Sequence, residues 1–345
     1  MSEREPRVTL VVLTYDGKEM LDLALPSILG QSYADRRVLV VDNGSSDGIA
    51  KHLAERWPAV DVHRLEANVG VAAALNRGVE ANDSELVALL NNDVELANDW
   101  LERLVAALDR QPRAASACGK LLRFDDRSTL DAAGDVLLWS SATLNRGEGE
   151  PDRGQYDTPG PIFAPTAAAA LYRRAALEEV GPFDEDFFAY HEDFDWALRA
   201  QLRGLTSWYE PAAVGYHMGA ATTRRRQGLY GRLQRRNQLL LVLKGFPARA
   251  LARHSPKIVA LHLLWLVASV RDRMVREQLQ AWVQVARALP ATAHKRCAIQ
   301  RARRVSIAYL DGLMRVGPGG PLPPAARIRR ALFEIAPNWI RPPRG

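Results

Sequence analysis

Cysteines and long apolar segments are scarce in this 345-residue sequence, and their scarcity excludes several classes of protein. Cys118 and Cys297 are too few for a disulfide framework or a four-thiolate zinc site, and they suit a reducing compartment. The thirteen mainly apolar residues between Lys257 and Arg271 would rise about 20 Å as a helix, whereas a bilayer core measures about 30 Å. The first residues lack the apolar stretch of a secretory signal, so we expect no such signal.

Acidic residues are few in the last third of the chain. Residues 218–345 contain 25 Lys and Arg against four acids, a net charge of +21, whereas residues 1–217 carry a net charge of −15. The overall content of 47% hydrophobic and 25% charged residues is that of an ordinary globular protein. The asymmetry therefore predicts two regions with different partners.

A glycine-rich phosphate-binding loop is also missing after the first strand-like segment. Asp16-Gly17-Lys18 supplies one glycine where a dinucleotide-binding fingerprint needs three, and no Walker loop is present. The sequence therefore lacks the main feature that would indicate a hydride-transfer enzyme or an ATPase. A bound nucleotide would have to be held by side chains.

Strand-like and helical patterns alternate over the first part of the chain. Four β-branched segments, 8–15, 37–42, 60–65 and 85–90, are apolar enough to predict buried parallel strands. Val71 begins one intervening helical pattern, and Asn98 occupies the N-cap position of another. The alternation predicts a doubly wound α/β fold, in which ligands bind beyond the carboxyl ends of the strands.

Polar residues follow each predicted strand, where the ligand crevice should lie. They are Thr14 and Tyr15 after the first strand, Asp42 at the end of the second, Asn68 and Gly70 after the third, and Asn91, Asn92 and Asp93 after the fourth. The segment from residue 42 to 48 also has the composition of an ordinary turn and helix cap. Asp42 differs because it closes the strand.

Six carboxylates lie between Asp184 and Asp195, and such crowding should raise at least one pKa. We expect a helix to begin near His191, with Asp195 in an exposed ion pair with Arg199. Glu192 and Asp193 would lie in its first turn, where simple helix capping is the alternative to a functional role.

His217 ends a further strand-like segment, 212–217. A lone histidine is not usually a metal ligand. Here, however, it could complete a metal site that Asp93 begins.

Five segments in this order and spacing resemble inverting glycosyltransferase family 2: VVLTYDGKEMLDLALPSILGQSY, VVDNGSSDG, NVGVAAALNRG, LLNNDVE and GPFDEDFFAYHEDFDWALR. The resemblance covers roughly residues 7–245 and is greatest to rhamnosyltransferase-like and galactofuranosyltransferase-like members. It implies the nucleotide-diphospho-sugar transferase (GT-A) fold, a Rossmann-like, mainly parallel sheet flanked by helices.

The implied organisation has three parts. A catalytic domain would occupy residues 1–220, with a nucleotide-sugar half at about 1–119 and an acceptor half at about 120–220 that includes a mobile loop over 120–160. A basic helical extension would occupy 221–316, followed by a proline-rich tail, 317–345.

The resemblance also implies roles for individual residues. Thr14 and Tyr15 would line the base pocket, Asp42 would accept a hydrogen bond from pyrimidine N3–H, and Asn68 and Gly70 would lie against the nucleoside. Asn91, Asn92 and Asp93 occupy the family's Asp-x-Asp position, where two asparagines replace the usual residues; Asp93 with His217 would hold Mg²⁺ or Mn²⁺. Asp193 would be the general base, with Glu192 as the alternative.

The basic region suggests contact with a membrane surface. Arg224, Arg225, Arg226, Arg232, Arg235 and Arg236 precede the apolar segment 239–246, a combination typical of an amphipathic helix on an anionic leaflet. A helical bundle with a solvated basic face, or an oligomer interface, is the alternative. We expect a protein on the inner face of the cell membrane, in the cytoplasm.

Together these features predict inverting, metal-dependent transfer of a sugar from a pyrimidine nucleotide diphospho-sugar to a lipid-linked or cell-surface glycan. The first candidate donor is dTDP-rhamnose, and UDP-galactofuranose or another UDP-sugar follows. A nucleotidyltransferase would need a basic, glycine-rich loop after the first strand, and nucleic-acid binding would need interleaved aromatic residues or a groove-reading motif. The sequence contains neither, so we expect no nucleic-acid partner.

Overall fold

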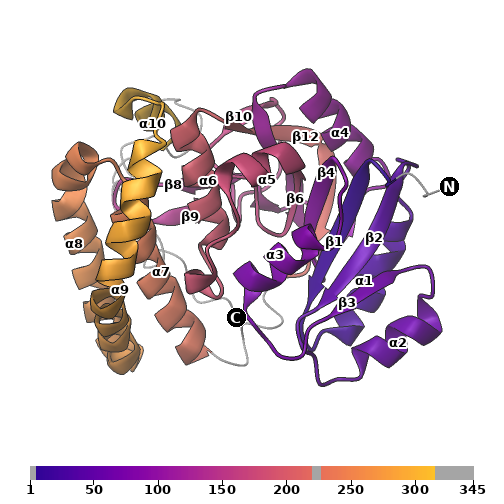
Figure 1. Cartoon of the computed structure of the whole chain (residues 1–345), viewed down its shortest axis with the longest axis horizontal. Helices are drawn as coiled ribbons and strands as arrows, with labels where there is room; N and C mark the ends of the chain where they lie inside the picture. Colours follow the sequence, from indigo (N-terminus) through magenta and orange to yellow (C-terminus); the bar gives the residue numbers. More distant parts are fainter. Residues whose placement is uncertain (1–4, 220–226, 315–345) are drawn as a thin grey trace.

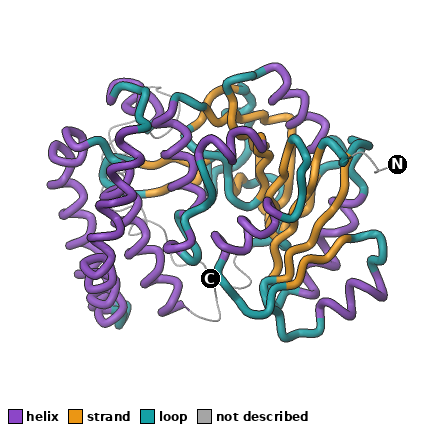
Figure 2. Tube along the Cα trace, viewed as in Figure 1, coloured by secondary structure: helices purple, strands orange, loops and turns teal. Residues whose placement is uncertain are grey.

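The computed structural model describes residues 5–219 and 227–314, and a ten-stranded sheet runs through it (Figures 1 and 2). The strand order is β10-β12-β6-β11-β4-β1-β2-β3, with β5 paired to β12 and β7 paired to β6. The ten strands are β1 (Val8–Thr14), β2 (Arg36–Asp42), β3 (Asp61–Arg64), β4 (Leu86–Asn91), β5 (Val94–Leu96), β6 (Ala114–Arg123), β7 (Leu130–Ala132), β10 (Gly160–Ile162), β11 (Ala169–Arg173) and β12 (Thr206–His217).

The first four predicted strands form one parallel half of the sheet, β3-β2-β1-β4. Thr14 lies opposite Asp42 and Leu13 opposite Asn91, so the carboxyl ends of β1, β2 and β4 meet at one edge. β3 is parallel as predicted, but it is largely exposed rather than buried, because it forms the margin of the sheet and has a neighbour on one side only. The α/β class and the predicted strand positions are confirmed.

The other half of the sheet is mixed. β11 runs antiparallel to both β4 and β6, whereas β6 and β12 are parallel. The prediction of one mobile loop over residues 120–160 is wrong. That segment continues β6, contains β7, and forms a two-stranded sheet of β8 (Asp135–Leu137) and β9 (Thr143–Asn145). Its glycines serve tight turns, since Gly134 and Gly147 have positive φ angles, and apolar side chains of β8 and β9 are buried against α8.

Helices cover the sheet and continue beyond it. They are α1 (Lys18–Leu29), α2 (Ile49–Arg56), α3 (Val71–Glu80), α4 (Trp100–Arg110), α5 (Arg174–Val180), the 3-10 helix η1 (Glu185–Phe187), α6 (Glu192–Arg203), α7 (Gln227–Gly245), α8 (Ala248–Arg271), α9 (Val275–Arg301) and α10 (Ile307–Leu313). The N-cap of α4 is Asp99, not Asn98 as predicted. The Asn98 side chain instead donates a hydrogen bond to the Gly30 carbonyl, which takes it away from the helix end.

The basic C-terminal extension is helical, and α7 to α10 lie together on the side of the molecule opposite β2 and β3 (Figure 1). They are packed onto the rest of the protein, because Leu198 and Leu202 of α6 share an apolar cluster with Leu241 and Phe246. Within the described residues, no helix is both long and apolar enough to cross a bilayer. The predicted boundary at residue 220, the arginines at 224–226 and the tail 317–345 lie outside the described residues.

Candidate active site

A cavity of about 370 Å³ lies at the carboxyl ends of β1 and β4, between α3 and the start of α6. Ten of the eleven residues that the sequence singled out line it; Asp42 is the exception. The lining residues are Leu13, Thr14, Tyr15, Asn43, Asn68, Gly70, Val71, Leu75, Leu89, Leu90, Asn91, Asn92, Asp93, Ala167, Tyr172, Phe183, Phe188, Ala189, Tyr190, Glu192, Asp193 and His217. The fold therefore brings segments nearly 200 residues apart into one site, as expected at the strand ends of an open α/β sheet.

Hydrogen bonds between neighbouring strand ends fix the polar wall of the cavity. The Asn92 side chain donates to the Thr14 hydroxyl at 2.9 Å, which joins the ends of β4 and β1. Asn43, which directly follows β2, donates to the Gly70 carbonyl at 3.2 Å and accepts from the Val69 amide at 3.0 Å. Asn43 was not singled out from the sequence. Its position beside Asp42 at a strand end was the available signal.

Asp42 is fully buried behind this wall rather than in it. Its Oδ1 atom accepts a hydrogen bond from the Ser45 amide at 2.9 Å, so it shapes the turn after β2. Its Oδ2 atom has no hydrogen-bond partner in the described part of the chain, and the Arg64 guanidinium lies 3.6 Å away. The role of Asp42 toward a pyrimidine base stays a prediction.

Gly70 lies in the cavity wall with a positive φ of 90°. A Cβ atom there would lie 2.5 Å from the Phe188 carbonyl oxygen. The structure thus supplies its own reason for a glycine, because the loop before α6 approaches the backbone of α3 at this point.

Asp93 and His217 lie side by side in the cavity lining, so the structure brings together the two residues that the sequence paired. The His217 Nε2 atom is 3.4 Å from Asp93 Oδ1, and its Nδ1 atom is 2.8 Å from Asp131 Oδ2. Burial alone would lower the pKa of His217, but hydrogen bonds to Asp131 and Asp93 outweigh it and raise the pKa to about 10. Asp131 comes from β7, within the segment that was expected to be a loop, so sequence reasoning missed it.

Asp93 and His217 could hold a divalent cation together with a bound substrate if the His217 Nε2 atom gives up its proton, because a metal-bound imidazole is neutral. In metal sites, a carboxylate that accepts a hydrogen bond from the histidine nitrogen not bound to the metal fixes the ring and its tautomer. Asp131 occupies this position at the Nδ1 atom of His217. In the part of the chain that is described, no cluster of three or more metal-binding side chains occurs, so further ligands would have to come from a bound substrate.

Glu192 and Asp193 begin α6 and point into the cavity from the side opposite the strand ends. Both side chains are buried. Burial, followed by repulsion from the neighbouring carboxylate, raises the pKa of Glu192; burial also raises the pKa of Asp193, although backbone amide hydrogen bonds oppose it. Raised pKa values of carboxylates in a cavity are a common feature of functional sites, and the choice between a general base and a helix cap stays a prediction.

The loop in front of α6 has an unusual backbone. Phe188, Tyr190 and His191 have φ angles of 62°, 70° and 70°, although none is glycine. Each such residue costs of order 1–3 kcal/mol, and such outliers gather at functional sites. Phe188 and Tyr190 line the cavity but were not identified from the sequence, because nothing in their residue types indicates this conformation.

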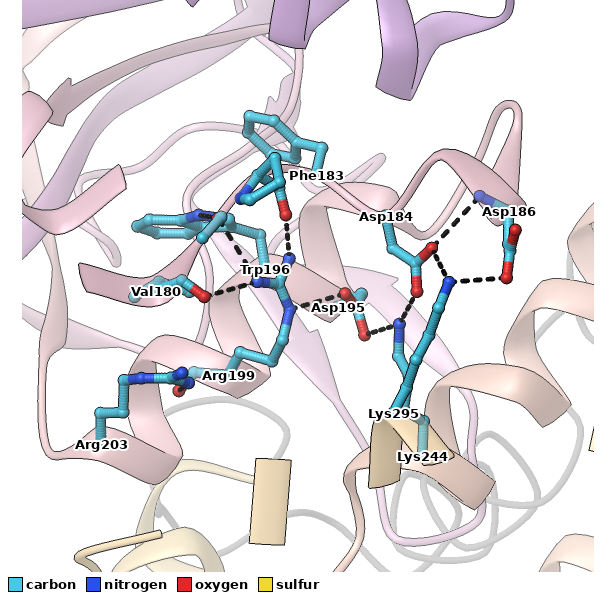
Figure 3. A network of polar contacts seen from close by, with 12 residues as sticks. Val180, Phe183, Asp184, Asp186, Asp195, Trp196, Arg199, Arg203, Lys244 and Lys295 are labelled. Atoms are coloured by element: carbon cyan, nitrogen blue, oxygen red, sulfur yellow. Dashed lines mark hydrogen bonds and ion pairs between the residues drawn. The ribbon is translucent and has the colours of Figure 1, made fainter. Parts of the chain in front are cut away.

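Two other carboxylates of the acidic segment, Asp184 and Asp195, belong to a buried ionic network (Figure 3). Asp195 was expected in an exposed pair with Arg199. It is instead 1% exposed and contacts both Arg199 and Lys244 at 2.8 Å, because α7 covers this face of α6. Asp184 pairs with Lys244 and Lys295. Burial would raise the pKa of Asp184, but the two ammonium groups lower it to about 2.

The fold and the cavity define a group-transfer enzyme with polar strand ends on one side and two buried carboxylates on the other. Residues 9–181 match the family model described as Glycosyl transferase family 2. N-acetylglucosaminyl-diphospho-decaprenol L-rhamnosyltransferase of Mycobacterium tuberculosis is 30% identical over 245 residues, which is 63% of this chain and 77% of the relative. Poly-beta-1,6-N-acetyl-D-glucosamine synthase of Staphylococcus epidermidis is 23% identical over 60% of this chain and 48% of its own. The chain belongs to glycosyl transferase family 2 and is a glycosyltransferase.

Solved structures agree on the fold. GalNAc-T7, determined with UDP, GalNAc and Mn²⁺, matches with a TM-score of 0.58 at 14% identity over 75% of this chain and 51% of its own. The mannosyltransferase PcManGT of Pyrobaculum calidifontis, in complex with GDP-Man and Mn²⁺, matches with a TM-score of 0.52 at 20% identity over 97% of this chain and 89% of its own. The predicted GT-A fold is confirmed.

Proposed function

We propose that this glycosyltransferase moves a sugar from a pyrimidine nucleoside diphospho-sugar to a hydroxyl group of a lipid-linked or cell-surface glycan, with inversion at the anomeric carbon. The observation that carries the proposal is the cavity itself, which joins donor-side strand ends to two buried carboxylates. The name of the M. tuberculosis relative supports rhamnose as the sugar and a lipid diphospho-sugar as the acceptor class, and dTDP-rhamnose is our first donor candidate. A UDP-sugar, galactofuranose or a hexose, is the second candidate.

In this reaction Asp193 is the general base, and Glu192 is the alternative. The acceptor hydroxyl loses its proton to the carboxylate as its oxygen attacks the anomeric carbon, and the nucleoside diphosphate departs from the opposite face. Such a base contributes roughly 10² to 10⁴ in rate. This route is a single displacement that needs one base and forms no covalent intermediate.

The donor side of the cavity binds and orients the nucleotide in this proposal. Thr14, Tyr15, Asn68, Gly70, Asn91 and Asn92 would surround the nucleoside and diphosphate, and Asp42 would reach the base only if the turn around Ser45 adjusts. Asp93 and His217 would hold Mg²⁺ or Mn²⁺, which supplies positive charge for the leaving diphosphate. The two structural neighbours determined with Mn²⁺ are consistent with this use of a metal.

We also propose that α8 rests on the inner face of the cell membrane. Val259, Leu263, Val267 and Val270 repeat at helical spacing along α8, and each is more than half exposed. Arg249, Arg253, Lys257 and Arg271 of the same helix are exposed as well, a composition that suits an anionic leaflet.

Vesicle sedimentation tests this placement. We expect binding to vesicles that contain phosphatidylglycerol and loss of binding in Leu263→Glu/Val267→Glu, whereas Leu23→Glu, an equally exposed site on α1, binds as the parent does. Equal binding of the two variants would contradict the placement and favour an oligomer interface on α8.

The donor proposal is tested by thermal stabilisation with dTDP-, UDP-, GDP- and CMP-sugars, each with and without Mn²⁺. A ligand at 100 times its Kd stabilises the folded protein by about 2.7 kcal/mol, and no acceptor is needed. We expect one pyrimidine diphospho-sugar to stabilise the protein most, with the shift reduced by a chelator and in Asp93→Ala. A larger shift with GDP-sugars would overturn the pyrimidine assignment.

A further inference from the structure

Three backbone carbonyls of the loop before α6 converge on one side chain of the C-terminal helices. The Asn237 Nδ2 atom, on α7, lies 2.8 Å from each carbonyl oxygen of Phe187, Ala189 and Tyr190. Asn237 is fully buried, and its Oδ1 atom has no hydrogen-bond partner among residues 5–219 and 227–314. The two amide hydrogens are shared by three acceptors, so all the hydrogen bonds found for this side chain go to the loop.

The loop is one that needs external support. Phe188, Tyr190 and His191 hold positive φ angles that side-chain-bearing residues rarely adopt, so the local sequence alone does not favour this conformation. The Asn237 amide supplies a donor to the carbonyls of Ala189 and Tyr190, and it adds a second donor to the Phe187 carbonyl, which also accepts from the Ala189 amide. Removing that amide therefore favours relaxation of the loop.

The opposite side of the loop is held by the donor half of the molecule. The Phe188 carbonyl accepts hydrogen bonds from the amides of Val71 and Ala72 at the start of α3, where Gly70 leaves room for it. The loop is thus fixed between α3, which borders the donor side, and α7, which belongs to the C-terminal helices. α6 begins directly after His191, so the position of this loop sets where Glu192 and Asp193 enter the cavity.

We propose that Asn237 is a positioning residue for sugar transfer: it holds the loop from Phe187 to Tyr190 and so places the Asp193 carboxylate against the acceptor side of the cavity. The inference rests on the proposed function in one respect, the identity of Asp193 as the base. It gives α7, which lies beyond the residues matched by the family model, a direct part in building the active site. The same helix also contacts the loop through Arg236, which donates to the Asp186 carbonyl.

The test compares Asn237→Leu with Gln238→Met in the full-length protein. Gln238 is also a buried amide on α7, but its Oε1 atom has no partner in the described structure, so its replacement controls for loss of a buried polar group. We expect faster hydrogen exchange in Asn237→Leu over residues 184–195 and at the amides of Val71 and Ala72, with the Gln238 variant unchanged. Hydrogen exchange needs no ligand.

Turnover supplies the second measurement, as nucleoside diphosphate released from dTDP-rhamnose or UDP-galactofuranose with a lipid diphospho-N-acetylglucosamine as acceptor. We expect kcat to fall about 10- to 100-fold in Asn237→Leu with donor affinity retained, because small displacements of a catalytic group have effects of this size. Asn237→Ser keeps one hydrogen-bond donor, so its kcat should lie between those of the parent protein and Asn237→Leu. This variant replaces Asn237→Leu in the test if the leucine variant does not fold.

The outcomes separate the inference from the proposed function. Unchanged exchange over 184–195 in both Asn237 variants, or parental kcat in them, would overturn the positioning role. Retained turnover in Asp193→Asn would instead overturn the assignment of the base, and the exchange data would still decide whether Asn237 holds the loop.

Discussion

The two walls of the cavity are built in different ways. The donor wall comes from strand ends whose polar residues bond mainly to one another, as Asn92 does to Thr14 and Asn43 to Gly70. The other wall is formed by Phe188 to Tyr190 and by Glu192 and Asp193, and the segment that carries these residues is held by side chains from α7 and α9, more than 40 residues further along the chain. The comparison teaches that the helical extension is packed against the segment that carries Glu192 and Asp193 and supplies that segment with buried polar partners.

The acidic segment shows what these distant partners decide. Asp184 and Asp195 meet ammonium and guanidinium groups, and the pKa of Asp184 is lowered. Glu192 and Asp193, in the same segment and also buried, have raised pKa values. Neighbouring carboxylates thus divide into those whose pKa a cation lowers and those whose pKa burial raises, according to whether a cationic side chain reaches them.

The largest effect on turnover is expected when the carboxylate of Asp193 is neutralised. We expect Asp193→Asn to lower kcat by about 10² to 10⁴, because the attacking hydroxyl loses its general base, with donor binding nearly unchanged. Donor titration and nucleoside diphosphate release measure the two effects. Glu178→Gln, an exposed carboxylate on α5, is the control that should retain full activity.

Removal of a structural cation should affect folding instead. Lys244 is 3% exposed and contacts both Asp184 and Asp195. We expect Lys244→Met to destabilise the fold by about 3 kcal/mol, since two buried carboxylates each lose a partner. The matched change Lys295→Met removes a side chain that is 37% exposed and should cost less than about 1 kcal/mol. Equal losses in urea unfolding would contradict the distinction.

On the donor wall, the metal site can be tested through Asp131. In Asp131→Ala the His217 ring loses the carboxylate on its Nδ1 atom. We expect donor affinity measured with Mn²⁺ to fall about 10- to 100-fold, the usual effect of removing such an outer partner. Affinity measured in the presence of a chelator should be the same in both proteins, and a loss there would place Asp131 in the nucleotide site itself.

The pH profile sharpens the assignment within the acidic pair. Burial raises the pKa of Asp193 to about 6 and that of Glu192 to about 8, and the base must be deprotonated to act. If Asp193 is the base, turnover is half-maximal near pH 6 and falls about tenfold per unit at lower pH. If Glu192 is the base, the fall is centred near pH 8 instead, and turnover is lost in Glu192→Gln but largely retained in Asp193→Asn.

Much of the fold and of the donor wall could be predicted from the sequence. Apolar strands alternate with helical patterns in the sequence, which predicts a parallel sheet. Parallel strands bring their carboxyl ends to one edge, so the sequence alone predicts that Thr14, Asn91 and Asp93 lie close together. Most predictions that were wrong concern how deeply a residue or segment is buried and what packs against it. Asp195 was expected to be exposed, residues 120–160 were expected to form a loop, and β3 was expected to be buried.

What the sequence determined by itself was the order of strand-end residues and hence the class of protein, because periodicity and turn chemistry act over a few residues. Only the tertiary structure decided which carboxylates are paired, which loop is strained, and that Asp131 contacts His217 and Asn237 contacts the loop before α6. Those properties depend on burial and on charges and amides supplied from distant helices and strands. No local pattern encodes such contacts, because they arise only when α7 and α9 pack against α6 and when β7 pairs with β6.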